Sequence, residues 1–373
     1  MSTSHLIADR TKQIEVSGIR KVFELGRSLK DPINLSIGQP HFPVPDAIKN
    51  AAKDAIDRNL NGYTVTQGVA ELRERILADL KLRYGHADRD VIITSGTSGG
   101  LLLAMMAVVN PGDEVIIPDP YFVSYPHLVT LVGGKSVYVD TYPDFRIDPD
   151  KIEAAITAKT KVILLCSPSN PTGATVSPDV QKALAAIADK HGVLLLSDEI
   201  YRAFHYDETP QSPASHSENV LVIEGYGKTY GMTGWRLGYA HGPKAIVDEM
   251  MKLQQFTFVC APSIVQYAGI AAMDFDVTGI VADYKQKRDR ICAGLRDRFE
   301  FNAPGGAFYL FPKAPWGTGT EFVSEAVKNS LLIIPGGVFS KRDSHFRISY
   351  AAKDETLDRG IEVLNRLAEG EQK

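Results

Sequence analysis

Short apolar runs alternate with helical patterns through the middle of the chain, and this alternation constrains the fold more than any other feature. Most of the runs are apolar at consecutive positions, which is typical of strands that are covered on both faces. Helical patterns at about 98–109 and 178–190 each follow one of these runs. The order predicts a largely parallel sheet that lies between helices. The strands are expected at 91–94, 114–117, 136–139, 162–166, 193–197 and 220–223.

The two ends of the chain follow a different pattern, in which short strands separate helices. Helices are expected at about 17–29, at about 278–301 and from residue 354, and short strands at 33–37, 307–311, 332–334 and 345–350. Residues 1–45 and 276–373 should therefore form a smaller α+β domain beside a large domain at 46–275.

The composition is typical of a globular enzyme and argues against several kinds of partner. The chain has 373 residues, of which 44% are hydrophobic and 23% charged, and its net charge is −4. No basic field therefore exists to attract nucleic acid or an anionic membrane. The N-terminus lacks the apolar core of a signal peptide. Cys166, Cys260 and Cys292 lack the spacing of metal ligands and suit a reducing compartment, so we expect a cytoplasmic protein without a metal site.

Lys228 lies in a glycine-rich segment, GKTYGMTGWRLG (227–238), just beyond the expected strand at 220–223. The glycines allow a ligand to approach the backbone closely, and Arg236 follows eight residues later. A solvated surface lysine is the ordinary alternative, because most lysines are exposed. The dense glycines favour instead an amine that is held against a bound anionic ligand.

Ligands of an open α/β sheet bind beyond the carboxyl ends of its strands, so the residues that follow each expected strand are candidates. The strand at 91–94 leads into SGTSGG, where Gly96, Thr97 and Ser98 open a helix. Free backbone N–H groups and the positive end of that helix suit a phosphate. An ordinary capped helix is the alternative.

Two further residues follow expected strands at the same edge. Asp198 ends a buried strand, where a carboxylate needs a cation or hydrogen-bond donors, although it could instead cap the next turn. Asn170, before a proline, leans toward an extended conformation and could be a plain turn residue. Tyr121 could be a packed loop residue, and Arg347, on one face of the expected strand at 345–350, could be an ordinary surface arginine.

The lysine segment closely resembles the signature of class I aminotransferases, the pyridoxal phosphate enzymes of fold type I that include the aspartate aminotransferases. Matching positions run from Gly38 to Arg347. The resemblance implies an α/β fold with a mostly parallel seven-stranded sheet, pyridoxal 5′-phosphate as cofactor, and Lys228 as the residue that forms a Schiff base with it. Gly225 and Gly227 stand where many relatives carry serine, so we expect no hydroxyl contact to the cofactor phosphate there.

The same resemblance assigns roles to the remaining candidates. The residues implied at the cofactor phosphate are Gly96, Thr97, Ser98 and Arg236, with Tyr63 reaching across from a neighbouring subunit. Those implied at the cofactor ring are Tyr121 on its face, Asp198 at its nitrogen, and Asn170 and Tyr201 at its phenolic oxygen. Those implied at the substrate are Arg347, Asn170 and the backbone of Gly38, with Phe308 either lining the pocket or lying in the core. A homodimer with the active site at its interface is thereby implied.

The implied activity is the transfer of an amino group between an L-amino acid and a 2-oxo acid by a ping-pong mechanism. Lys228 would hold the cofactor and then move a proton between the substrate Cα and the cofactor, while Asp198 and Tyr201 adjust the electronics of the ring. Fold and cofactor alone do not fix the reaction. A carbon–sulfur β-lyase, an amino acid cyclase and a noncatalytic ligand sensor are therefore alternatives. Aspartate, alanine, aromatic and branched-chain amino acids are all compatible donors.

Overall fold

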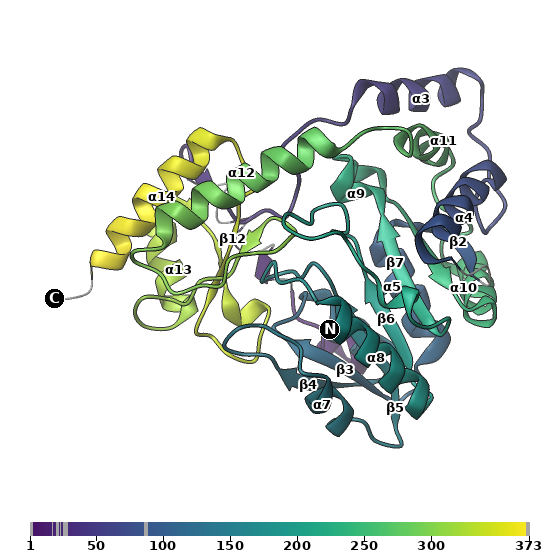
Figure 1. Ribbon diagram of the computed structural model, residues 1–373, viewed down its shortest axis with the longest axis horizontal. Coiled ribbons are helices and arrows are strands. Elements are labelled where there is room, and N and C mark those ends of the chain that lie inside the picture. The colour runs from purple at the N-terminus through teal and green to yellow at the C-terminus, as the bar shows by residue number, and fades with distance from the viewer. Residues whose placement is uncertain are drawn as a thin grey trace.

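A seven-stranded sheet forms the centre of the molecule, and helices cover both of its faces (Figure 1). The structure is a computed structural model that describes residues 3–16, 18–19, 22, 24, 29–85 and 89–370. The strand order is β2-β8-β7-β6-β5-β3-β4. The strands expected from the apolar runs are all present, as β2 (Asp90–Ser95), β3 (Glu114–Asp119), β4 (Lys135–Asp140), β5 (Thr160–Cys166), β6 (Leu194–Asp198) and β7 (Val220–Gly225).

The sheet is mostly parallel, as the sequence predicts. Strands β7, β6, β5, β3 and β4 are paired in parallel. The seventh strand, β8 (Leu237–Gly242), runs antiparallel between β7 and β2. The apolar pattern does not reveal β8, because Gly238, His241 and Gly242 interrupt it. This strand begins beside the end of β2, where Leu237 pairs with Ser95, and ends where Gly242 pairs with Asp90.

Helices pack against the sheet in three groups. One face is covered by α5 (Gly96–Val108), α6 (Ser124–Leu131) and α10 (Lys244–Thr257), and the other by α7 (Pro149–Ala154) and α8 (Pro178–His191). The edge at β2 is covered by α3 (Asp46–Asp57), α4 (Ala70–Tyr84) and α11 (Ser263–Ala272). The helix expected at 98–109 is α5, and it begins at Gly96, directly after β2. None of the helices in the described ranges is long and apolar enough to cross a membrane.

Helix α8 shows how local sequence sets its limits. The Ser177 hydroxyl accepts a hydrogen bond from the backbone N–H of Val180 at 3.4 Å, and Pro178 occupies the first turn, where its missing N–H costs nothing. Gly192 ends the helix with a φ of 63°, which glycine adopts without strain. The helix predicted at 178–190 is thus confirmed.

The two ends of the chain meet in a separate group of strands and helices. Strand β1 (Ile33–Asn34) pairs in parallel with β10 (Leu331–Leu332), which joins segments from opposite ends of the sequence. Strands β11 (Ile334–Pro335), β12 (Phe346–Ser349) and β9 (Tyr309–Leu310) form an antiparallel sheet. The helices beside them are α12 (Thr278–Leu295), α13 (Gly319–Lys328) and α14 (Asp354–Glu369). In Figure 1 the long helix α12 extends from the sheet-bearing part toward this group.

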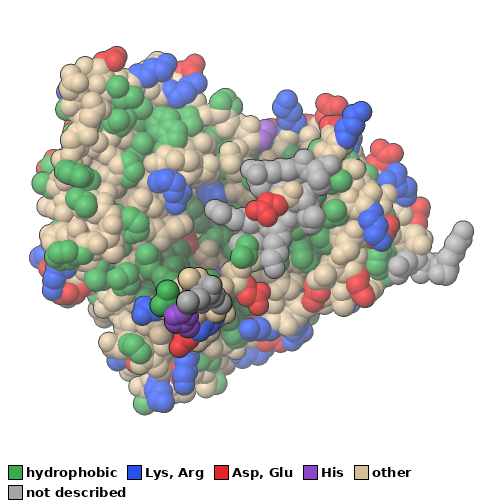
Figure 2. Space-filling view, turned by 180° about the vertical axis from the view of Figure 1, so that it is seen from behind, with side chains coloured by type: hydrophobic (Ala, Val, Ile, Leu, Met, Phe, Trp, Pro, Cys, Tyr) green, Lys and Arg blue, Asp and Glu red, His purple; other side chains and the backbone are tan. Residues whose placement is uncertain are grey.

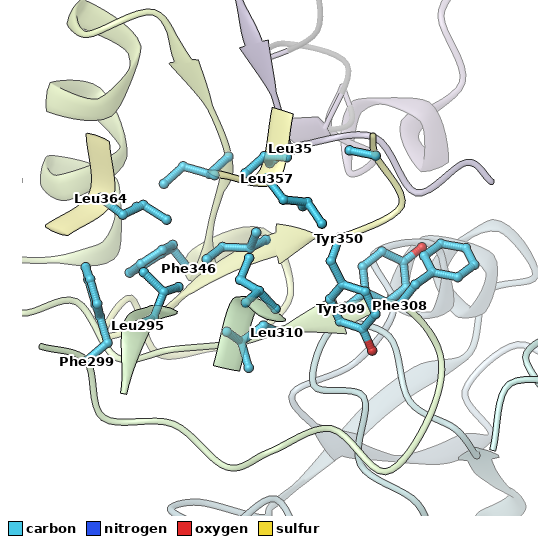
Figure 3. Packing of buried hydrophobic residues seen from close by; sticks show 14 of the residues in the cluster. Leu35, Leu295, Phe299, Phe308, Tyr309, Leu310, Phe346, Tyr350, Leu357 and Leu364 are labelled. Carbon is cyan, nitrogen blue, oxygen red and sulfur yellow. The ribbon is translucent and has the colours of Figure 1, made fainter. Parts of the chain in front are cut away.

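This second group has a core of its own. Leu35 from the N-terminal segment lies beside Leu357 of α14, and Phe346 of β12 lies between them and Leu295 (Figure 3). All of these side chains are buried. Packing of this extent explains why residues so far apart in sequence hold one position.

The N-terminal segment is only partly described. It contains α1 (Asp9–Lys12), and Gly18, Ile19, Val22 and Glu24 are helical, which agrees with part of the helix expected at 17–29. Residues 17, 20–21, 23 and 25–28 of that expected helix lie outside the described residues.

Candidate active site

A cavity of about 250 Å³ lies beyond the carboxyl ends of β2, β5, β6 and β7, where the ligands of open α/β sheets bind. Figure 2 shows the side of the molecule that is hollowed between the sheet-bearing part and the part with α12 to α14. The sequence-predicted residues that line the cavity are Gly38, Thr97, Ser98, Asn170, Asp198, Tyr201, Lys228, Arg236 and Arg347. The structure therefore brings together residues from nearly the whole length of the chain.

Lys228 lies in the short helix α9 (Tyr226–Thr229), which follows directly on β7. Its ammonium Nζ donates a hydrogen bond to the backbone carbonyl of Gly38. Burial, together with the nearby Arg347 and Arg236 cations, lowers the pKa of Lys228 to about 8, whereas Asp198 opposes the shift. About a tenth of this amine is therefore unprotonated and nucleophilic at pH 7.

Asp198 ends strand β6 and is only 3% exposed. The Tyr125 hydroxyl donates to its Oδ2 at 2.8 Å, and the backbone N–H of Ile200 donates to its Oδ1 at 3.2 Å. Burial raises the pKa of Asp198 to about 6, while those two hydrogen bonds and the Lys228 charge act in the opposite direction. A buried carboxylate of this kind is suited to pair with a cation that enters the cavity.

Arg347, on β12, is a buried cation that has no carboxylate partner among the described residues. Its Nη1 donates to the Asn170 side-chain oxygen and its Nη2 to the Ser36 carbonyl, each at 2.8 Å, while its Nε has no partner. The guanidinium carbon lies 4.5 Å from the ring centroid of Tyr309 and 4.6 Å from that of Phe339. A buried guanidinium without a counter-ion is costly, so the arrangement favours a ligand with a carboxylate.

The start of α5 faces a second cation. Its N-cap residue, Ser95, makes no side-chain capping bond. A Cβ added at Gly96 would lie 2.5 Å from the Arg236 guanidinium, so that side chain sits over the first turn, and Gly96 also has a φ of 69°. An arginine at the positive end of a helix is unfavourable unless an anion lies between them. This geometry, with the Thr97 and Ser98 side chains in the same wall, is suited to a phosphate.

Close packing against Thr97 explains why position 225 is a glycine. A Cβ at Gly225 would lie 2.9 Å from the Thr97 methyl group and 3.0 Å from the Ile200 side chain. Thr97 therefore fills the space that a serine at position 225 would need. A Cβ at Gly227 would meet only an ordinary contact, at 3.4 Å from Thr233.

Tyr121 and Phe308 do not line this cavity. Tyr121 packs against Tyr138 of β4 with ring centroids 5.2 Å apart and lines a neighbouring cavity, whereas the next residue, Phe122, lines this one. Phe308 is fully buried in the core between Tyr201 and Phe204, which is one of the two positions expected for it, and the next residue, Tyr309, lines the cavity. Adjacent side chains of an extended segment point in opposite directions, so in each case the neighbouring residue faces the cavity.

Tyr63 also lies away from the cavity of its own chain, and it is 88% exposed. Its loop is tied to α10, because the Gln254 side chain donates to the Thr66 carbonyl at 2.6 Å. Exposed Phe256 and Val259 lie at the end of that helix. Tyr63 is therefore an exposed aromatic side chain on a loop that is bonded to α10.

Some functional candidates were not found by sequence reasoning. Tyr125, Cys166, Ile200, Phe122 and Tyr309 all line the cavity. Tyr125 stands three residues after Phe122, and the helical spacing at the start of α6 is the one signal that could have indicated it.

Comparison with known proteins identifies the family. Residues 30–364 match the family described as aminotransferase class I and II. The chain belongs to this family. It is 38% identical to a probable aspartate aminotransferase of Methanocaldococcus jannaschii, over 98% of this chain and 100% of that protein. It is 37% identical to a probable N-acetyl-LL-diaminopimelate aminotransferase of Bacillus subtilis, over 96% of this chain and 95% of that protein.

A solved structure gives the same result for the fold. The aspartate aminotransferase of Thermus thermophilus with maleate matches with a TM-score of 0.92 and 32% identity, over 97% of this chain and 99% of that chain. The protein is therefore an aminotransferase of fold type I, and it depends on pyridoxal phosphate.

The residues present fit this cofactor. The cavity offers a buried amine, a buried carboxylate and a helix N-terminus that faces an arginine, and these three features match an aldehyde, a pyridine nitrogen and a phosphate. The rim of the cavity adds the Asn170 amide and the Tyr201 hydroxyl, which can bond a phenolic oxygen.

Proposed function

We propose that this aminotransferase moves the amino group of an L-amino acid to a 2-oxo acid by a ping-pong mechanism, with Lys228 as the residue that forms the Schiff base. The observation that carries the proposal is the Lys228 amine, whose pKa is lowered to about 8, in one cavity with Asp198 and Arg347. When bound, pyridoxal phosphate supplies an aldehyde that condenses with amines and a ring that withdraws electrons.

The residues of the chain have distinct parts in this proposal. Gly96, Thr97, Ser98 and Arg236 bind the cofactor phosphate, and Asp198 holds a proton on the pyridine nitrogen. Asn170 and Tyr201 bond the phenolic oxygen. Phe122, in place of Tyr121, covers one face of the ring, because it lines the cavity.

Arg347 orients the substrate. The Nη groups of Arg347 already bond Asn170 and Ser36, and its Nε has no partner. The guanidinium can therefore donate further hydrogen bonds to an α-carboxylate that binds beside the Gly38 backbone. Lys228, which lines the same cavity as Arg347, would act as the base that takes and returns the proton of the substrate Cα. Burial keeps part of this amine in the base form at neutral pH.

The donor is an amino acid with a free α-carboxylate. The relatives described above are named for aspartate and for N-acetyl-LL-diaminopimelate. We place aspartate first among the donors to be tried, followed by alanine and by aromatic and branched-chain amino acids, with 2-oxoglutarate and pyruvate as acceptors.

Steady-state kinetics with this panel test the proposal. A ping-pong aminotransferase gives parallel double-reciprocal lines when donor and acceptor are varied together, and no product forms without an acceptor. Release of ammonia and pyruvate without any 2-oxo acid would overturn the proposal in favour of a lyase.

We further propose a homodimer in which Tyr63 of one subunit reaches the cofactor phosphate of the other. The support is an exposed apolar surface next to the cavity, formed by Tyr63, Val65, Phe256, Phe258 and Val259. Figure 2 also shows hydrophobic side chains on the sheet-bearing part beside the hollow. Sedimentation of the wild-type protein and of Y63A measures the oligomeric state, and both should sediment as dimers. Cofactor binding should be weaker in Y63A, because the partner subunit no longer contacts the phosphate.

Two coarser proposals concern organisation and location. We propose a large domain at 46–275 and a small domain at 1–45 and 276–373, supported by the pairing of β1 with β10 and by their shared core. We propose a cytoplasmic location, supported by the free thiols of Cys166, Cys260 and Cys292.

A further inference from the structure

Tyr309 connects parts of the site that the sequence treats as separate. Its hydroxyl lies 2.7 Å from the Tyr201 hydroxyl, and its ring lies against the Arg347 guanidinium, 4.5 Å from centroid to carbon. A Cβ added at Gly38 would collide with the Tyr309 hydroxyl. Tyr309 is 1% exposed, so these contacts fix it in one place.

The two hydroxyls hold two protons, and the direction of their hydrogen bond decides what Tyr201 can do. If Tyr201 donates to Tyr309, it has no proton left for another acceptor. If Tyr309 donates, the Tyr201 proton is free to point into the cavity. Among the described residues, neither hydroxyl makes another hydrogen bond. Burial raises the pKa of both phenols, so both keep their protons across the working range.

We propose that Tyr309 is a positioning residue with two effects: its hydroxyl donates to Tyr201, so that Tyr201 donates to the phenolic oxygen of the cofactor, and its ring supports Arg347. The proposal rests on the proposed function and names no new chemical step. The proposal adds to that function a residue that acts through Tyr201 and Arg347 rather than on the reacting groups themselves.

The first effect has a visible consequence. In a chain of hydrogen bonds each bond polarises the next, so Tyr201 becomes a stronger donor when it also accepts from Tyr309. A stronger donor stabilises negative charge on the phenolic oxygen, and this favours loss of the proton from the nitrogen that joins Lys228 to the cofactor. The pH at which the colour of the holoenzyme changes reports that loss.

The test compares three substitutions by absorbance titration of the holoenzyme and by donor kinetics. Y309F removes the hydroxyl and keeps the ring, so it should raise the pH of the colour change by about 0.5 unit, with little effect on the donor KM. Y201F should raise it further. F339L removes the other ring at Arg347, so it should raise the donor KM about fivefold and leave the colour change in place.

The proposal is overturned if Y309F leaves the colour change within about 0.1 pH unit of the wild-type value, or lowers it, or if F339L shifts it as far as Y309F does. Failure of the proposed function is a separate result. In that case the wild-type protein itself would take up no cofactor colour or would exchange no amino groups.

Discussion

Arg236→Gln separates two closely related ligands, pyridoxal phosphate and pyridoxal, which lacks the phosphate. In the structure the Arg236 Nη1 donates to the Thr233 carbonyl at 3.0 Å, and the guanidinium lies over the start of α5, where an anion between the two would be stabilised by both. The substitution should therefore weaken binding of the phosphorylated ligand and leave binding of pyridoxal unchanged. Without ligand, it should not destabilise the fold, because it removes a cation from the positive end of a helix.

The size of the effect follows from the contact that is lost. A hydrogen bond to a charged group contributes about 1.5–3 kcal/mol, which corresponds to a change in Kd of roughly 10-fold to 150-fold. Arg236 is exposed, so solvent screening favours the lower end of that range. We expect the Kd for pyridoxal phosphate to rise about tenfold to thirtyfold.

Equilibrium titration of cofactor-free protein with each ligand, followed by absorbance, measures both constants. Arg298→Gln is the matched control, because Arg298 is an exposed arginine that pairs with Glu369 in α14, outside the cavity. The reasoning is refuted if R236Q weakens pyridoxal as much as pyridoxal phosphate, or if R298Q has the same effect as R236Q.

Three further outcomes are expected. Arg347→Met should lower kcat/KM for amino acid donors at least about thirtyfold, at unchanged cofactor colour, because a charge-assisted clamp contributes roughly 2 kcal/mol or more. Asp198 has its pKa raised from 3.8 to about 6, so its contribution to folding is full below pH 3.8 and is lost as pH rises through 6. In urea unfolding of cofactor-free protein, the wild type should therefore lose about 2.4 kcal/mol relative to D198N between pH 4 and pH 7, and a constant difference would contradict this. Phe122→Ala should weaken cofactor binding about threefold to tenfold while Tyr121→Ala weakens it less, and the reverse order would restore Tyr121 to the ring face.

Much of the fold follows from the sequence because buried parallel strands have a simple pattern. The runs that became β2 to β7 are apolar at consecutive positions, and each is covered by helices on both faces. Strand β8 is different, since its glycines and His241 are required by close packing rather than by burial of apolar surface. A Cβ at Gly238 would lie 2.8 Å from the backbone of Gly96, a contact that no local pattern predicts.

The site residues that could be predicted from the sequence are those that end or follow a strand. Asn170, Asp198 and Lys228 all follow strands of one sheet, so topology alone brings them to one edge. The positions of Tyr121 and Phe308 could not be predicted, because the direction of a side chain in a loop or at a strand end depends on its packing partners. Tyr138 and Tyr201 are those partners, and both are distant in sequence.

The central claim is that the amine of Lys228 condenses with the aldehyde of the cofactor, and borohydride trapping tests it most directly. Holoenzyme is treated with borohydride, digested and examined by mass spectrometry, with Lys228→Ala and the exposed Lys252→Ala in parallel. We expect the wild type and K252A to carry the reduced cofactor on the peptide that contains Lys228, and K228A to carry none. Label on another lysine, or no label on wild-type protein that has been saturated with cofactor, would contradict it.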